Sequence, residues 1–270
     1  MIVVATSEDE VLGVRASLDE LRVHVVKTVA AGESRLLVFA AVDDERQAEP
    51  IAVTLRAGGV MAVVRPDRGP SLDAWMRHTE PVRFGDRLSV CFAWSEYDRA
   101  GLSGLIELGP GGFGNGEHPA TRLLVELLLE RVAPGERVLD VGCGSSVLGL
   151  CALRLGAARV VAADIKEAAI AATRRNAALN GMDERVDAAL APLGQIKGTF
   201  DIVVANIGRG AIVELAPELV RLLAPGGWLA LSGISPPQCS QVAGFLRPLA
   251  EFERRTSGEW SALVVGHPGR

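Results

Sequence analysis

The most informative segment of this sequence is Val138-Leu-Asp-Val-Gly-Cys-Gly-Ser-Ser146, which follows a predicted strand and opens a predicted helix. Gly142 and Gly144 let the backbone pass close to a ligand, because a side chain at either position would clash. Asp140, at the end of the strand, is placed to bind a cationic amino group of the ligand, directly or through water. About twenty residues later the next predicted strand ends at Asp164, whose carboxylate can accept hydrogen bonds from two hydroxyls of a ribose.

These features together indicate a site for an adenosine-containing cofactor, and two cofactors of that kind compete. A dinucleotide-binding fold requires three glycines in the pattern G-x-G-x-x-G, with the pyrophosphate at the N-terminus of the helix. In this chain Val147 occupies the third glycine position. The acid that precedes the first glycine suits a ligand with an ammonium group better than one with a pyrophosphate. The sequence therefore favours S-adenosylmethionine over NAD.

Around this segment, apolar strands alternate with helical patterns. The predicted strands are Arg137–Val141, Arg159–Ala163, Val186–Ala189, Phe200–Ala205 and Trp228–Ser232. The predicted helices are 147–155, 166–179, 209–223 and 236–247. Because connections between parallel strands must cross over, this alternation predicts a mostly parallel sheet with helices on both faces. The predicted fold class is α/β.

The N-terminal region has a different order of elements. Its apolar runs and helical stretches are Ile2–Ala5, Glu8–Leu18, Leu21–Val29, Arg35–Val42, Glu45–Leu55 and Val60–Val64. Read in sequence, they give the order β-α-β-β-α-β, which is typical of a small α+β, ferredoxin-like domain.

A segment rich in proline and glycine separates the two regions. We interpret it as a linker with one short helix around Trp75, followed by a strand at Arg87–Phe92. The predicted division is a small α+β domain at residues 1–65, a linker and strand region at 66–103, and a catalytic domain at 104–270.

Composition excludes several classes of protein. Apolar residues make up 49% of the chain, and the net charge of −5 argues against binding nucleic acid through the overall field of the protein. The four cysteines show no CxxC spacing and no histidine at zinc-ligand distance, so we expect reduced thiols and no metal site. The N-terminus lacks the basic region of a signal peptide, and no apolar run approaches the roughly 20 residues of a membrane span. We therefore expect a soluble cytoplasmic protein.

Four stretches of the sequence resemble motifs of a known family. They are Val138–Ser146 for D-x-G-C-G-S-G, Gly112–Thr121 for A-F-G-T-G-x-H-x-T-T, Val203–Ile207 for V-V-A-N-I, and Pro225–Ile234 for G-G-x-L-x-L-S-G-I. Further similarity lies at Trp75, Pro81, Gly85, Arg87, Leu88 and Trp94. Over residues 75–265 the chain thus resembles the class I methyltransferases and, within them, the ribosomal protein L11 methyltransferase family.

The resemblance implies a Rossmann-like catalytic domain, with a small N-terminal domain that recognises the substrate. It also implies that the segment at residues 112–121 folds over the cofactor. The cofactor-binding residues expected from this segment are Phe113, Asn115, His118 and Thr121. The chain departs from the family pattern at three positions, which are Ser146 in place of glycine and Asn115 and Ala120 in place of threonine. These departures bear on cofactor affinity and substrate choice.

Several candidate residues have a structural alternative. Asp140 and Asp164 could simply cap the helices that follow them, although their positions at strand ends favour binding of the ligand. Asn206 ends a strand beside the expected switch point of the sheet, where it could orient an amine substrate and bind the cofactor, or it could be an ordinary turn residue. His118 could act as a base, but we assign it to binding.

The leading hypothesis is an S-adenosylmethionine-dependent methyltransferase that modifies lysine or N-terminal amines of a protein such as ribosomal protein L11. A methyltransferase of small molecules is the first alternative, and a catalytically weak cofactor-binding relative is the second. We expect a protein partner, no direct binding of nucleic acid and no membrane.

Overall fold

The computed structural model describes residues 2–7, 10–21, 23–30, 35–41, 45–57, 60–64, 80–95, 97–109 and 116–268. The chain forms two compact units. The first comprises residues 1–80, 92–98 and 109–113, and the second comprises residues 81–91, 99–108 and 114–270. The predicted short helix around Trp75 lies outside the described residues.

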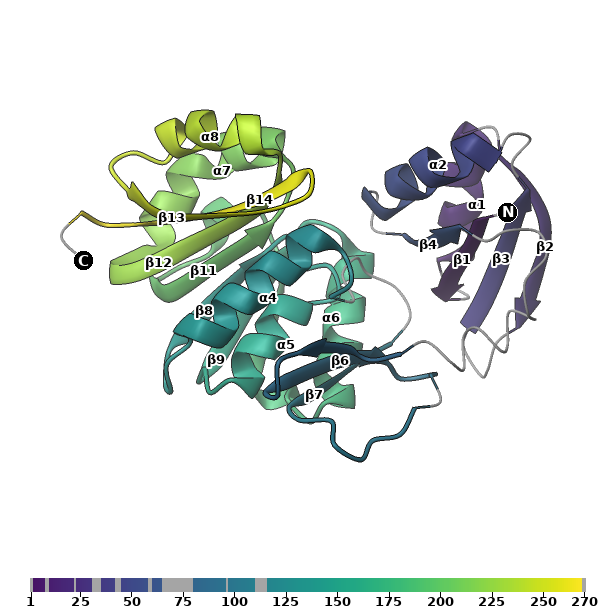
Figure 1. Cartoon of the computed structure of the whole chain (residues 1–270), viewed down its shortest axis with the longest axis horizontal. Coiled ribbons are helices and arrows are strands. Elements are labelled where there is room, and N and C mark those ends of the chain that lie inside the picture. The colour runs from purple at the N-terminus through teal and green to yellow at the C-terminus, as the bar shows by residue number, and fades with distance from the viewer. Residues whose placement is uncertain are drawn as a thin grey trace. The chain divides into compact units, whose positions relative to one another are not determined.

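The first unit has the predicted β-α-β-β-α-β order (Figure 1). Its elements are β1 (Ile2–Ser7), α1 (Val11–Glu20), β2 (His24–Ala30), β3 (Arg35–Ala41), α2 (Glu45–Ala57) and β4 (Met61–Val64). The strands are ordered β2-β3-β1-β4, and every neighbouring pair is antiparallel. Ile2, Leu18 and Ala52 are fully buried, so both helices pack their apolar sides on one face of this sheet. The ferredoxin-like prediction is confirmed.

A small three-stranded sheet precedes the large sheet in the sequence. Its strands are β5 (Val82–Phe84), β6 (Leu88–Phe92) and β7 (Leu105–Leu108), in the order β5-β6-β7. All five side chains of β6 are buried. The predicted strand at Arg87–Phe92 is therefore confirmed within one residue, whereas the short strands β5 and β7 were not predicted.

The second unit is built on a seven-stranded sheet with the order β10-β9-β8-β11-β12-β14-β13. The strands are β8 (Arg137–Val141), β9 (Arg159–Asp164), β10 (Val186–Leu190), β11 (Phe200–Asn206), β12 (Leu223–Ile234), β13 (Ala250–Ser257) and β14 (Trp260–Gly266). The first five in this order are parallel, while β14 runs antiparallel to β12 and β13. The five strands predicted from apolar runs are all present.

Helices cover both faces of this sheet (Figure 1). They are α4 (Pro119–Arg131), α5 (Val147–Arg154), α6 (Glu167–Leu179), α7 (Arg209–Leu222) and α8 (Cys239–Phe245), with 3₁₀ turns at Asp183–Arg185, Leu193–Gln195 and Pro236–Gln238. The buried residues of α7 and α8 form one cluster with strand residues such as Leu139 and Leu231, whereas α4 and α5 pack on each other. Because successive strand residues face opposite sides, the two helix pairs lie on opposite faces.

The helix predicted at 236–247 is wrong in extent. Two consecutive prolines, Pro236 and Pro237, hold a 3₁₀ turn that is closed by a capping box between Ser235 and Gln238. The α-helix begins only at Cys239 and ends at Phe245. Helix α4 was not predicted at all, although Pro119 in its first turn is a typical helix-start signal.

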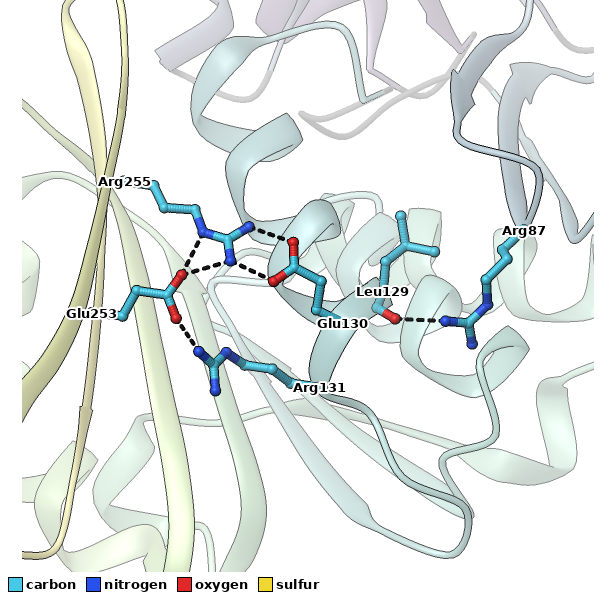
Figure 2. Close-up of polar contacts among 6 residues, drawn as sticks. All are labelled: Arg87, Leu129, Glu130, Arg131, Glu253 and Arg255. Atoms are coloured by element: carbon cyan, nitrogen blue, oxygen red, sulfur yellow. Dashed lines mark hydrogen bonds and ion pairs between the residues drawn. The ribbon is translucent and has the colours of Figure 1, made fainter.

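An ion-pair network ties the end of α4 to β13 (Figure 2). The Arg255 guanidinium donates to both carboxylate oxygens of Glu130 and to Glu253, and Glu253 also accepts a hydrogen bond from Arg131. Arg87 donates to the Leu129 carbonyl at 2.7 Å, which satisfies one of the last carbonyls of α4. These contacts hold α4 and the edge strand as one body, and the opposite end of α4 carries candidate site residues.

Candidate functional site

The strand order of the large sheet places the site. From β8 the chain proceeds outward through β9 to β10, whereas β11 and β12 lie on the other side of β8. The order therefore reverses between β8 and β11, and ligands of open α/β sheets bind at the carboxyl ends beside such a switch point. Asp140 on β8 is paired with Val204 on β11, two residues before Asn206, and Asp164 ends the neighbouring β9.

The turn between β8 and α5 adopts a conformation that favours glycine. Gly142 has φ +65° and Gly144 has φ +54°, both in the left-handed region. The amides of Gly142 and Cys143 donate to the Ala163 carbonyl at 2.9 and 3.2 Å, which fixes the turn against β9. A Cβ on Gly142 would lie 2.6 Å from the Ile207 side chain. Packing of this turn against Ile207 therefore leaves no room for a Cβ at position 142.

Asp140 is buried beneath this turn, with 2% of its surface exposed. Its Oδ2 accepts hydrogen bonds from the Ser146 hydroxyl and from the Gly149 amide, each at 3.1 Å. Burial raises the pKa of Asp140 to about 7, although both hydrogen bonds lower it and the nearby Asp164 raises it slightly. Asp140 is thus poised to gain or lose its charge near neutral pH.

Two residues that contact Asp140 were not predicted to do so. Ser146 has φ +58°, and among the described residues it is the one non-glycine with a positive φ. A Cβ on Gly149 would lie 2.8 Å from the Ser146 Oγ, 2.8 Å from Val160 and 3.2 Å from Asp140. Gly149 therefore allows α5 to pack directly on β8 and β9, the role that a third glycine would have at position 147 in a dinucleotide-binding turn.

Asp164 closes the turn from the neighbouring strand. Its Oδ2 accepts a hydrogen bond from the Gly144 amide at 3.3 Å, and its Oδ1 accepts one from the Lys166 amide at 3.0 Å. Asp164 does not cap α6, because the N-cap of that helix is Lys166 and no side chain caps it; the two hydrogen bonds instead orient the Asp164 carboxylate beside the glycine turn. The next residue, Ile165, is 76% exposed, which is unusual for a large aliphatic side chain at a strand end.

Asn206 and Thr121 meet although 85 residues separate them. The Asn206 amide nitrogen donates to the Thr121 hydroxyl at 2.9 Å, and Thr121 is 1% exposed in the first turn of α4. With its nitrogen held by Thr121, Asn206 retains an amide oxygen that has no hydrogen bond within the described residues. The pairing brings two candidate residues to one point, at the end of β11.

His118 caps α4. Its Nδ1 accepts a hydrogen bond from the Ala120 amide at 3.2 Å, and its ring contacts the edge of Trp260 at a centroid distance of 4.8 Å. This geometry links the segment before α4 to the first residue of β14. Phe113 and Asn115, also expected to bind the cofactor, lie outside the described residues.

The cysteines near the site are buried thiols. Burial raises the pKa of Cys151 to about 12, and burial raises the pKa of Cys143 further still. The Cys143 sulfur lies 3.2 Å from the Thr173 hydroxyl. Both thiols therefore stay neutral and add no charge beside Asp140.

Sequence and structure comparisons agree with this geometry. Residues 71–267 match the sequence profile of the family described as Ribosomal protein L11 methyltransferase (PrmA). The chain belongs to the ribosomal protein L11 methyltransferase family. The matched span contains the glycine turn, both carboxylates and Asn206, and the resemblance inferred from the sequence motifs is confirmed.

Relatives within the ribosomal protein L11 methyltransferase family cover much of the chain. A protein of that name from Pelobacter propionicus is 40% identical in an alignment 206 positions long that covers 73% of this chain and 66% of the relative. Another from Geotalea daltonii is 35% identical in an alignment 278 positions long, gaps included, that covers 92% of this chain and 85% of the relative. The chain therefore spans slightly less than two thirds of the length of the Pelobacter relative.

A solved structure supports the fold. The ribosomal protein L11 methylase from Lactobacillus delbrueckii subsp. bulgaricus is similar with a TM-score of 0.64 and 30% identity, over 69% of this chain and 98% of that chain. With the mostly parallel sheet, this confirms the predicted Rossmann-like α/β class. Among the helices that the structure describes, none has both the length and the apolar character needed to cross a bilayer.

Proposed function

We propose that this chain transfers a methyl group from S-adenosylmethionine to an amine nitrogen of a protein, with ribosomal protein L11 as the leading substrate. The observation that carries the proposal is the group of residues at the carboxyl ends of three adjacent strands. A glycine turn, the carboxylates of Asp140 and Asp164 and the amide of Asn206 come together there. Membership of the ribosomal protein L11 methyltransferase family supports the same reaction.

The donor and acceptor groups at this edge fit S-adenosylmethionine. The glycine turn lets a ligand approach the backbone closely. The Asp164 carboxylate has lone pairs left for two ribose hydroxyls, and the exposed Ile165 offers an apolar surface for the adenine base. Asp140 supplies the negative charge for the ammonium group of the ligand, directly or through water. The remaining candidates, Phe113, Asn115 and His118, are proposed to complete the cofactor site.

The protein itself contributes little covalent chemistry to the reaction. When bound, S-adenosylmethionine supplies a methyl group that its sulfonium has already activated. The protein must position the amine nitrogen in line and exclude water around it. We assign this task to Asn206, whose amide oxygen has no hydrogen bond within the described residues. It can accept one from the amine N–H and so direct the nitrogen lone pair at the methyl carbon. The amine reacts in its neutral form, so the ammonium group of the substrate must first lose one proton to solvent.

The N-terminal unit is proposed to recognise the protein substrate. It has its own sheet and core, and neither the glycine turn nor the paired Asn206 and Thr121 belongs to it. A separate domain for recognition suits a macromolecular substrate, since a small molecule needs only the catalytic unit.

Methyl-labelled S-adenosylmethionine tests the proposal. Purified protein would be incubated with ribosomal protein L11, and in parallel with an extract of the source cells depleted of this chain, with Asp140→Ala as the control. We expect label in ribosomal protein L11, and no label with the variant. Label only in the small-molecule fraction would instead support a small-molecule methyltransferase. Cofactor binding without transfer to any acceptor would indicate a binding protein that lacks activity.

A further inference from the structure

Ser146 holds a backbone conformation that glycine would adopt more easily. Its φ of +58° lies in the left-handed region, and its side chain is fully buried. The family motif quoted above has glycine at this position. A serine here therefore keeps an unfavourable conformation that the motif avoids, and its side chain should have a function that offsets the strain.

The function suggested by the contacts is to hold Asp140. The Ser146 hydroxyl donates to Asp140 Oδ2 at 3.1 Å, and the Gly149 amide donates to the same oxygen at 3.1 Å. Two donors on the same oxygen restrict the rotation of the carboxylate. Within the described part of the chain, Oδ1 has no hydrogen bond, so it keeps its full capacity to accept one from a ligand or a bridging water.

We propose that Ser146 is a positioning residue of the cofactor site, whose hydroxyl fixes the Asp140 carboxylate to receive the ammonium group of the cofactor. The inference rests on the proposed function, because it assumes a cofactor with an ammonium group beside Asp140. It goes beyond that function by giving a role to a residue at which the chain departs from its family motif.

The charges around Asp140 make the hydroxyl important near neutral pH. Burial raises the pKa of Asp140 to about 7, and the Ser146 hydrogen bond opposes that rise. Among the described residues, the other titratable groups that face Asp140 are Asp164 from β9, which also raises the pKa, and the thiols of Cys143 and Cys151, which are neutral. Loss of the hydroxyl should therefore leave a larger fraction of Asp140 protonated at pH 7.

Two variants separate the hydroxyl from the backbone strain. Ser146→Gly removes the hydroxyl and relieves the strain, whereas Ser146→Ala removes the hydroxyl and keeps the strain. Binding of S-adenosylhomocysteine would be measured by titration calorimetry between pH 6 and pH 9, with thermal unfolding of each variant as a check on folding. If the pKa of Asp140 rises by about one pH unit, both variants should bind about fivefold more weakly than wild type at pH 7 and within about twofold of it at pH 9.

A second probe distinguishes the possible failures. 5′-Methylthioadenosine has the adenosine but lacks the amino-acid part with its α-ammonium group, so its affinity should be the same for wild type and both variants. If the two variants differ from wild type in stability but bind S-adenosylhomocysteine equally well at every pH, Ser146 is structural only and the inference is wrong. If wild type binds neither adenosine ligand, the proposed function itself fails.

Discussion

Replacing Asp140 by asparagine tests the electrostatics of the site without any ligand. Asparagine keeps the shape of the side chain and an oxygen that can accept from Ser146 and Gly149, but it cannot ionise. In wild type, burial raises the pKa of this carboxyl from 3.8 to about 7. The folded protein therefore holds the Asp140 proton more tightly than the unfolded chain does.

The pH dependence of the protein's stability follows from the difference between the pKa of Asp140 in the folded protein and in the unfolded chain. The stability contributed by the raised pKa is full below about pH 4 and is lost as the pH rises through about 7. The two pKa values are about three pH units apart, at about 1.4 kcal/mol for each unit, so the total loss is about 4 kcal/mol. About 3 kcal/mol of it falls between pH 5 and pH 8. Asp140→Asn does not suffer this loss.

Calorimetric unfolding of the ligand-free proteins at pH 5 and pH 8 measures the effect. For a chain of this size 1 kcal/mol corresponds to roughly 2 °C in Tm, so the Tm of Asp140→Asn minus that of wild type should rise by about 5 °C between the two pH values. Any constant cost of burying the amide cancels in this comparison. Asp187→Asn, at an exposed position on β10, is the control and should show no such rise. A Tm difference that stays constant from pH 5 to pH 8 would refute the assigned burial of a titrating Asp140.

Three further substitutions, each with a matched control, test contacts of α5, of the far end of α4 and of Asn206. Gly149→Ala should destabilise the protein by about 1–3 kcal/mol in chemical denaturation, because its Cβ would lie 2.8 Å from two side chains. The control Gly244→Ala on α8 has open space around its Cβ and should be neutral or slightly stabilising. Arg255→Ala removes the centre of the network in Figure 2 and should cost about 1–2 kcal/mol. Arg254→Ala breaks the pair with Glu251 on the same strand and a long contact of 3.5 Å to the Ser240 hydroxyl, and should cost less than about 0.5 kcal/mol. Equal losses in urea unfolding would contradict this. Thr121→Val removes the acceptor of the Asn206 amide, to which we assign the positioning of the substrate amine, and should lower kcat roughly tenfold with little change in cofactor affinity. Thr121→Ser should restore most of the rate.

The parts of the fold that depend on local patterns were predictable. The five parallel strands are continuous apolar runs, and the order β-α-β-β-α-β is written directly in the N-terminal sequence. The turn between β8 and α5 was also predictable, since Gly142 and Gly144 are the residues that a left-handed backbone favours. Even α4 had a readable signal in His118 and Pro119 at its start.

The contacts of the site depend on long-range packing, and the sequence could not supply them. Thr121 and Asn206 are both polar residues in predicted motifs, but nothing in their spacing shows that one holds the other. Likewise Asp140 was predicted as a strand-end ligand, whereas its burial and its two donors follow from how closely α5 packs on the sheet. Gly149 was the available signal for that close packing. A glycine weakens a helix, so its presence inside one indicates that a larger side chain would not fit.

In the proposed cofactor site, the Asp140 carboxylate would link the stability of the free protein to its affinity for the cofactor. A buried charge without a cation destabilises the ligand-free fold, and the same charge stabilises the complex when an ammonium group lies beside it. Asp140→Asn should therefore raise the stability of the free protein at pH 8 and weaken cofactor binding. Ser146→Ala should lower stability and affinity together, because it removes a donor to the carboxylate and leaves the charge buried. The electrostatic explanation predicts that stability and cofactor affinity change in opposite directions in Asp140→Asn and in the same direction in Ser146→Ala. A simple loss of packing would instead lower the stability of both variants.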